Sequence, residues 1–397
     1  MDSGQAVSTT RRRRSINSRS PALSFCQCTT LITYVLGIVG ILAIASFLVW
    51  QHLIVVKNNT NAERPIVDYA DNRPKQEPPS LPQQRQPPRW KCGLRNLGNT
   101  CYMNSALQCL RHIPVLNGFL SHPAISRQIE RRRNQSSDAR WIWEYNELID
   151  WMNYGEERGR CRRIDPRAVY DAMLHVAPRT FHRYRQEDAT EVVQYFFQAV
   201  ETVLANDPGA TAAWNSIAKR TEVIDRRRWT HDGALMPLVN VAPESSYDLR
   251  LILPEQNDVI DLRALMDRYF NEPMQDLGDA GSMQETRRIR VAPDVLVVAL
   301  NRVNLAQHQI QTPVQVPLRL DMQPFMEDET AVQYDLLAVV NHLGHGAKSG
   351  HYVAKARYGP NSEQWFLFND QLVSIVSPEN VIDTRHVCQV TYQRRRP

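Results

Sequence analysis

An uninterrupted apolar run near the N-terminus constrains this 397-residue chain more than any other feature. Leu31 to Trp50 contains 20 residues without a charged side chain, and the sequence stays largely apolar to Val56. As an α-helix, 20 residues span about 30 Å, the thickness of the hydrocarbon core of a bilayer. A signal peptide has a shorter apolar region followed by a small-residue cleavage site. The run therefore predicts one transmembrane helix over residues 31–56.

The segments on either side of this run are distinct in composition. Residues 1–30 carry five arginines against one aspartate, a net charge of +4 out of +5 for the whole chain. The positive charge is therefore local, which argues against a nucleic-acid-binding protein. Residues 57–89 are polar and contain seven prolines, which predicts an extended linker. The globular part then covers residues 90–397.

The cysteines exclude two kinds of small-domain architecture. There are seven of them, an odd number, at spacings that do not form a disulfide framework, so a secreted domain built on disulfides is not expected. No two Cys-x-x-Cys motifs are present, so a four-cysteine zinc site is not expected either. We predict no metal and no cofactor.

Helix signals come first in the globular part, and strand signals dominate later. The predicted helices cover residues 104–111 (starting near Cys101), 165–176 and 186–204, and the predicted strands are 248–253, 295–300, 334–340, 352–357 and 365–368. This order predicts an α+β fold, with the cleft between the helices and the strands.

Cys101 has the sequence setting of a catalytic nucleophile. The preceding residues, Gly93 to Thr100, are rich in glycine and asparagine and lead directly into the first predicted helix. The sulfur would then lie at a helix N-terminus, where free N–H groups and the helix dipole favour the thiolate. Cys109 lies in the same helix among apolar residues and is expected in the core.

A thiolate nucleophile needs a general base, and the base needs a side chain that orients it. The glycine-rich residues 344–350 lead into a strand at His351, and 18 residues later a second strand ends at Asn369 and Asp370. Adjacent strands of this length would bring Asn369 to the ring of His351. The order Cys, His, Asn is that of papain-like cysteine proteases.

These segments resemble the ubiquitin-specific protease family. The similar segments are Gly93–Ser105 (the cysteine box of the family), Gly350–Tyr352 with Trp365–Asp370 (the histidine box), Gln186–Glu191 (a short motif between them), and Leu296–Arg302 and Tyr334–His342 (later strands). Together they extend from about Cys92 to Val390, with a poorly matching middle.

The resemblance implies an α+β, papain-like cysteine protease fold with a helical thumb, a β-rich palm and reduced fingers, preceded by the transmembrane helix. It also implies hydrolysis of the bond after the C-terminal glycine of ubiquitin, with ubiquitin and ubiquitinated proteins as partners. By position in the motifs, Cys101 is the nucleophile and His351 the general base. Asn369 would orient the imidazole, Asp370 would assist, and Asn96 would be the oxyanion-hole side chain.

Four further residues in or near these motifs are Asp188, Glu191, His342 and His345. By the resemblance, Asp188 and Glu191 match acidic positions that face the arginines of the ubiquitin tail, although spacing alone would make them a solvated helix face. His342 matches a position that is commonly histidine in the family, where packing explains it better than catalysis. His345 lies in the loop before the base. Neither histidine is assigned a role.

The chain departs from the family in its middle. Most members carry two Cys-x-x-Cys pairs that bind a structural zinc in the fingers, whereas no cysteine lies between Leu204 and Val295. Any fingers here are therefore expected to be reduced and held together by packing alone. Val303 stands where the family usually has an aromatic residue. The arginine-rich stretch 127–163 has no counterpart and is expected to be a solvated insertion.

Other functions stay open beside the deubiquitinase. A catalytically silent ubiquitin-binding scaffold of the same fold is disfavoured because Cys101, His351 and Asn96 are all present. A protease for a ubiquitin-like modifier is an alternative that the sequence does not separate from the first. An unrelated papain-type peptidase is disfavoured because its local cysteine signature is absent.

Two arguments about the orientation in the membrane disagree: the distribution of basic residues and the location of ubiquitin. Five arginines precede the apolar run and only Lys57 and Arg64 follow it closely, so the positive-inside rule leaves the globular part outside the cytosol. A ubiquitin substrate requires the cytosolic side instead. A mitochondrial outer-membrane anchor reconciles the two, since the basic, serine-containing start resembles a mitochondrial targeting segment. The endoplasmic reticulum stays an alternative.

Overall fold

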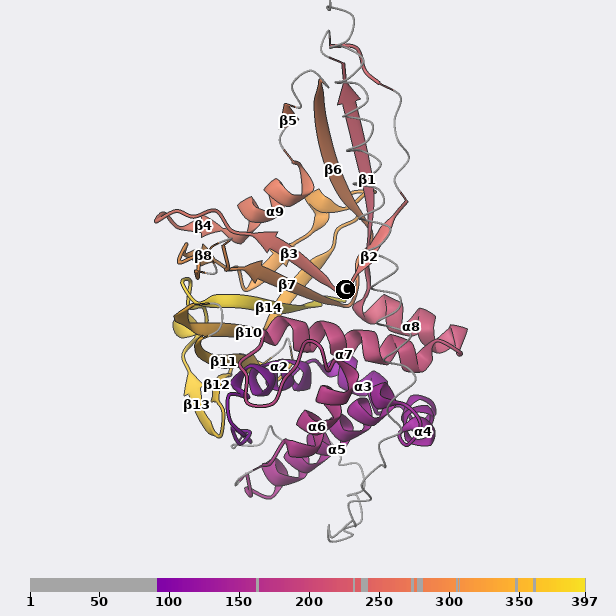
Figure 1. Ribbon diagram of the computed structural model, residues 1–397, viewed down its shortest axis with the longest axis vertical. Coiled ribbons are helices and arrows are strands. Elements are labelled where there is room, and N and C mark those ends of the chain that lie inside the picture. The colour runs from indigo at the N-terminus through magenta and orange to yellow at the C-terminus, as the bar shows by residue number, and fades with distance from the viewer. Residues whose placement is uncertain are drawn as a thin grey trace, which may run out of the picture. The chain divides into compact units, whose positions relative to one another are not determined.

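The computed structural model describes residues 91–161, 164–230, 233–236, 242–272, 275–276, 281–304, 306, 308–346, 349–359 and 362–396. The predicted basic segment 1–30, transmembrane helix 31–56 and linker 57–89 lie outside these residues. Most helices precede most strands along the chain, so the predicted α+β class is confirmed (Figure 1). None of the helices in the described part is long and apolar enough to cross a bilayer.

Most of the helices pack together against one face of the main sheet, with α2 at the centre (Figure 1). The helices are α2 (Cys101–Arg111), α3 (Pro114–Leu120), α4 (Pro123–Arg132), α5 (Ser137–Glu157), α6 (Arg167–Val176), α7 (Ala189–Leu204), α8 (Pro208–Ala218) and α9 (Leu262–Phe270). Every residue of α2 is buried, as in a helix surrounded by protein on all sides. The three predicted helices are confirmed as α2, α6 and α7, each with a start within three residues of the prediction.

The prediction of a solvated insertion over residues 127–163 is wrong. Helix α4 and the 21-residue α5 cover most of this stretch. Trp141 and Tyr145 of α5 are fully buried, and their rings lie 5.3 and 4.7 Å from that of Phe196 in α7. Between the arginines, apolar residues recur at spacings of three and four, and they form the face of α5 that packs in the core. Arginine side chains cover the outer face, where the guanidinium of Arg133 lies 4.2 Å from the ring of Trp143.

The strands within the described residues form three sheets. They are β1 (Arg220–Trp229), β2 (Glu244–Ser246), β3 (Asp248–Ile252), β4 (Ile260–Asp261), β5 (Gln275–Asp276), β6 (Ser282–Val291), β7 (Val295–Asn301), β8 (Val314–Gln315), β9 (Arg319–Asp321), β10 (Gln333–Gly346), β11 (Ser349–Arg357), β12 (Trp365–Asn369), β13 (Leu372–Val376) and β14 (Val387–Arg394). The main eight-stranded sheet has the order β13-β12-β11-β10-β14-β7-β3, with β9 beside β10. All five predicted strands are confirmed within it, as β3, β7, β10, β11 and β12.

The main sheet separates two hydrophobic cores. Along β7, Val295 and Val297 face the helical core, whereas Leu296 and Val298 face a second core that includes α9. This alternation follows from the pleat of a strand, which sends successive side chains to opposite faces. Both faces of the strand are covered, which explains why its sequence is a continuous apolar run rather than an alternating one.

A long ribbon of β1 and β6 projects away from the helices (Figure 1). The expectation that such fingers hold together by packing alone is wrong. The two strands pair in antiparallel register from Thr221 to Trp229, and ion pairs cross between them. Glu285 of β6 pairs with Arg226 of β1 at 2.5 Å, and Arg287 of β6 pairs with Glu222 of β1 at 3.5 Å. Paired charges replace much of the apolar contact because the ribbon is too thin to bury a core of its own.

A disulfide that the sequence did not predict joins Cys92 to Cys161, with 4.7 Å between their Cα atoms. It connects the extended segment that precedes α2 to the segment that follows α5. Beside it, Leu94 pairs with Ile164 in a parallel bridge, and the N–H of Arg95 donates to the carbonyl of Ile164. The two segments are therefore held together by covalent and hydrogen bonds at once.

Candidate active site

Cys101 is the first residue of α2, as predicted. The loop before it turns sharply, since Gly98 and Asn99 have φ values of 101° and 56°. The side chain of Asn96 stabilises this turn: its Oδ1 accepts hydrogen bonds from the backbone N–H groups of Gly98 (2.9 Å) and Thr100 (3.3 Å). The loop thus delivers the sulfur to the N-terminal end of the central helix.

The thiol of Cys101 is more enclosed than its setting in the sequence suggests. The residue is only 3% exposed. Burial raises the pKa of the Cys101 thiol and the Asp370 carboxylate acts in the same direction, while the backbone N–H of Tyr352 lowers that pKa. Desolvation thus opposes the effect by which a helix N-terminus favours a thiolate, and the thiolate stays a prediction.

His351 lies in β11, and its ring is oriented by the neighbouring strand. The Nε2–H of His351 donates to Oδ1 of Asn369, at the end of β12, over 2.7 Å. An amide oxygen only accepts, so this bond fixes the ring proton on Nε2 in the neutral imidazole. Nδ1 then carries the lone pair that can accept a proton from a thiol.

Asp370 holds the nucleophile loop from the other side. Its Oδ2 accepts from Nδ2 of Asn96 at 2.8 Å, and its Oδ1 accepts from Nδ2 of Asn104 at 2.7 Å. Its backbone carbonyl also accepts from the N–H of Leu94. One carboxylate in the turn after β12 therefore orients the predicted oxyanion-hole side chain and braces the first turn of α2.

The structure brings five predicted residues together: Cys101, His351, Asn369, Asp370 and Asn96. Their hydrogen bonds do not form a continuous chain from Asn369 through His351 to Cys101. Within the described residues, no hydrogen bond joins Cys101 to His351. The link between the two elements is the N–H of Tyr352, next to His351, which faces the Cys101 sulfur. A shift of the ring or of the thiol is needed before a proton passes between them. Catalytic contacts often tighten only when substrate is bound.

Asp188 and Glu191 lie at the start of α7, where Asp188 is the N-cap. Its Oδ1 accepts from the backbone N–H (2.7 Å) and the hydroxyl (2.6 Å) of Thr190. Asp188 is exposed, and its negative charge raises the pKa of both His342 and Tyr352, two neighbouring residues of the main sheet. Burial, followed by the charge of Asp188, raises the pKa of Glu191.

The described residues contain one group of three potential metal ligands, Cys92, Glu156 and Cys161, whose ligand atoms lie within 4.8 Å of one another. The two sulfurs are bonded to each other. Glu156 is already held by Lys91 at 3.0 Å and Arg111 at 2.6 Å, all three side chains being buried. As it stands, this group serves as a structural network that anchors the segment leading to Cys101.

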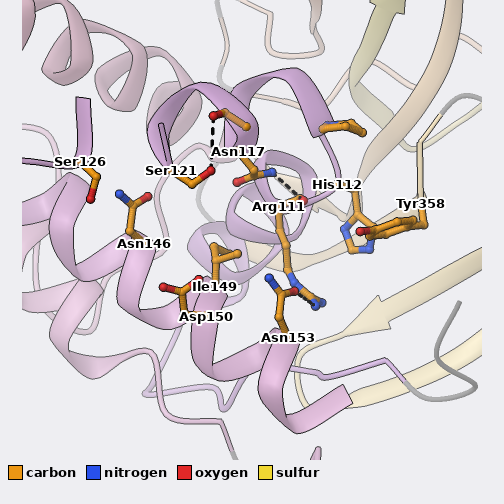
Figure 2. A pocket seen from close by; sticks show the side chains of 12 residues that line it. Arg111, His112, Asn117, Ser121, Ser126, Asn146, Ile149, Asp150, Asn153 and Tyr358 are labelled. Atoms are coloured by element: carbon orange, nitrogen blue, oxygen red, sulfur yellow. Dashed lines mark hydrogen bonds between the residues drawn. The ribbon is translucent and has the colours of Figure 1, made fainter. Parts of the chain in front are cut away.

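A cavity of about 400 Å³ lies at the opposite end of α2 from Cys101 (Figure 2). Arg111 and His112 line it from α2, and Asn153 from α5, where its Oδ1 accepts from Nη2 of Arg111 at 3.0 Å. Figure 2 shows Tyr358 beside His112 at one edge. None of the predicted site residues contributes to its lining.

Sequence reasoning missed three contributors to the site. Asn104 stands three positions after Cys101, so its place on the same face of a helix was readable, but its partner Asp370 is 266 residues away. The N–H of Tyr352 carries no sequence signal. The disulfide between Cys92 and Cys161 pairs two cysteines among seven, and no spacing rule selects that pair.

Comparison with known proteins adds independent findings. Residues 92–392 match the family model of ubiquitin carboxyl-terminal hydrolases. The chain is 26% identical over 339 residues to ubiquitin carboxyl-terminal hydrolase Usp2 of Drosophila melanogaster, covering 76% of this chain and 35% of that protein. It is 26% identical over 309 residues to ubiquitin carboxyl-terminal hydrolase 20 of Arabidopsis thaliana, covering 73% and 41%. The chain thus spans less than half the length of these two relatives.

Among solved structures, the chain is similar to one in the SAGA DUB module Ubp8/Sgf11/Sus1/Sgf73 bound to monoubiquitin. The TM-score is 0.62 at 20% sequence identity, with 80% of this chain and 72% of that chain covered. At this identity the likeness concerns the fold.

Proposed function

We propose that this chain, which belongs to the ubiquitin carboxyl-terminal hydrolase family of cysteine-type deubiquitinases, hydrolyses the isopeptide or peptide bond that follows the C-terminal glycine of ubiquitin. The observation that carries the proposal is the hydrogen bond from His351 to Asn369, beside a cysteine at the start of the central helix. Both lie within the segment that matches the family.

The reaction follows from these groups. The lone pair on Nδ1 of His351 accepts the proton of the Cys101 thiol, and the sulfur attacks the glycine carbonyl carbon. The carbonyl oxygen becomes an oxyanion, to which the second N–H of the Asn96 amide donates while Asp370 holds the first. Imidazolium protonates the leaving amine, leaving a thioester on Cys101. A water molecule, deprotonated by His351, then releases the ubiquitin carboxylate and restores the thiol.

The proposal is tested with ubiquitin that carries a C-terminal electrophile. We expect covalent labelling of the wild-type chain at Cys101 and loss of labelling in Cys101→Ser. Cys109→Ser is the matched control, because Cys109 lies in the same helix, fully buried, and should not react. Labelling that persists in Cys101→Ser would contradict the assignment.

The enclosed thiol favours one alternative, a ubiquitin-binding scaffold without catalysis. Cys101 is buried and is not hydrogen-bonded to His351 among the described residues. Binding of unmodified ubiquitin, measured beside probe labelling and hydrolysis, separates the two functions. A chain that binds ubiquitin but neither reacts with the probe nor hydrolyses a ubiquitin amide would be the scaffold. The same probes built on ubiquitin-like modifiers test the third reading.

We propose further that the chain acts at a membrane, on membrane-proximal substrates, with its catalytic part in the cytosol, at the mitochondrial outer membrane or the endoplasmic reticulum. The apolar run 31–56 supports the anchor, and the ubiquitin substrate supports the orientation. The disulfide between Cys92 and Cys161 pulls the other way, since the cytosol keeps such thiols reduced.

Fractionation with protease protection of residues 90–397 tests this location. The exposed Asn134, within the sequon Asn134-Gln135-Ser136, offers a second reporter. We expect protease access in intact organelles and no change in gel mobility with an N-glycosidase. A mobility shift that disappears in Asn134→Gln would place the catalytic part in the secretory lumen and remove ubiquitin as substrate.

A further inference from the structure

His342 is a buried histidine on β10, one strand away from the candidate base. The register of β10 and β11 pairs His342 with Tyr352 and Leu343 with His351. The imidazole of His342 stacks on the ring of Tyr352, with 4.4 Å between centroids and 25° between planes. The residue is 6% exposed, so its ring is packed inside the protein next to β11.

The edge of the same ring faces Gly350, the residue before His351. A Cβ atom at Gly350 would lie 2.4 Å from Nε2 and 3.1 Å from Cδ2 of His342, closer than real Cβ contacts allow. The backbone of Gly350 therefore lies directly against the imidazole. Nε2 of His342 has no hydrogen-bond partner among the residues that the structure describes. The ring and the backbone of Gly350 are therefore in van der Waals contact, without a hydrogen bond.

The backbone of His342 is fixed independently of this contact. Its N–H donates to the carbonyl of His386 at 2.8 Å, and its carbonyl accepts from Nε2 of Gln309 at 3.2 Å. The ring is thus attached to a rigid part of the sheet. It touches both chain neighbours of His351, one before and one after it.

We propose that His342 is a positioning residue for the reaction: its ring holds Gly350 and Tyr352 in place, and thereby sets the imidazole of His351 and the backbone N–H of Tyr352 relative to Cys101. The inference rests on the proposed function. Through these contacts His342 affects the positions of both His351 and Cys101 relative to each other. Its own side chain contacts neither the sulfur nor the bond that is cleaved.

The charge state of His342 suits this part. Burial lowers the pKa of His342, the neighbouring His386 and His351 lower it further, and only Asp188 opposes them. The ring is therefore neutral at physiological pH. A second imidazolium beside His351 would disfavour the proton transfer from Cys101, because like charges repel in a partly buried site.

The experiment compares His342→Ala and His342→Gln in the full chain, with His175→Ala, a histidine on α6, as the control. Rates are divided by the number of active sites titrated with the ubiquitin probe. We expect kcat to fall about 100-fold in His342→Ala, the scale of a 1 Å displacement of a catalytic group, with KM nearly unchanged. His342→Gln keeps an amide near the position of Nε2 against Gly350 and should recover part of the loss.

A double-mutant cycle sharpens the test. Gly350→Ala should reduce kcat in the wild-type background, where the new Cβ would lie 2.4 Å from Nε2 of His342 and 2.8 Å from the carbonyl oxygen of Leu343. Only the second of these contacts persists in His342→Ala. In His342→Ala the ring is absent, so the combined loss should be smaller than the product of the two single losses. Independent effects that simply multiply would contradict a shared contact.

Alkylation of Cys101 by iodoacetamide, followed by mass spectrometry, separates this inference from the proposed function because it needs no ubiquitin. We expect His342→Ala to change the alkylation rate of Cys101 and its pH dependence, while His175→Ala changes neither. If the wild-type chain hydrolyses no ubiquitin substrate, the proposed function fails while alkylation still tests His342. If His342→Ala leaves both the kcat per titrated site and the pH profile unchanged, the inference is overturned, whatever happens to the melting temperature.

Discussion

At the scale of single residues, the site depends on amides and one carboxylate more than on charges in contact with the nucleophile. Asn369 determines which nitrogen of His351 carries the proton, and Asp370 holds Asn96 and Asn104 on the nucleophile loop and helix. The nucleophile itself is buried, which works against the thiolate. Burial therefore favours the neutral thiol over the thiolate at Cys101.

This preference for the neutral thiol predicts a steep pH dependence for reaction with a small alkylating agent. Because burial raises the pKa of Cys101 above the ordinary thiol range, the thiolate fraction grows about tenfold for each pH unit below that pKa. We expect the iodoacetamide rate at Cys101 to keep rising from pH 7 beyond pH 9, with Cys101→Ser as the blank. A rate that is already constant near pH 7 would mean that the helix N-terminus stabilises the thiolate after all.

At the scale of elements, α7 shows how one side chain can serve structure and recognition together. Asp188 caps the helix through Thr190, and the family resemblance predicts that it also faces the tail of ubiquitin. The capping role requires only an acceptor oxygen at this position, whereas pairing with arginines requires the negative charge.

Two substitutions separate these roles. Asp188→Asn keeps the capping oxygen and removes the charge, so we expect unchanged thermal stability and a higher KM for a ubiquitin substrate. Asp188→Ala removes both, and should lower the free energy of unfolding by about 1 kcal/mol as well. Equal KM values for wild type and Asp188→Asn, with Glu191→Gln measured in parallel, would leave Asp188 as a cap alone.

At the scale of the whole molecule, the disulfide closes a loop between residues 69 positions apart and joins the segment before the active site to the helical part. In the chain-entropy description, closing a loop of this length stabilises the folded state by about 4 kcal/mol. The network of Glu156 with Lys91 and Arg111 surrounds the same junction.

We expect Cys161→Ala to lower the free energy of unfolding by about 4 kcal/mol, measured by denaturant titration without reductant. A reductant should bring the wild-type chain to the same stability and leave Cys161→Ala unchanged, which makes the variant its own control. Peptide mapping in which Cys92 and Cys161 of the untreated chain are both alkylated would show that the bond is not formed.

Local sequence patterns predict part of the elements and the candidate reacting groups. The nucleophile at a helix start, and a histidine and an asparagine on two successive strands, are signals carried by residues close together in the chain. Turn residues and the spacing of apolar residues determine where helices and strands begin and end. For this reason α2, α7, β11 and β12 were predicted near their observed bounds.

How these groups contact one another depends on the packing of helices against the sheet. Examples are the burial of Cys101, the double role of Asp370, the pairing of Cys92 with Cys161 and the contact of His342 with Gly350. No local sequence pattern links the partners in these contacts. Such contacts depend on how the helices pack against the sheet. Many different pairs of residues would be equally compatible with the local sequence. That is why the stretch 127–163 looked like an insertion, although its apolar face completes the helical core.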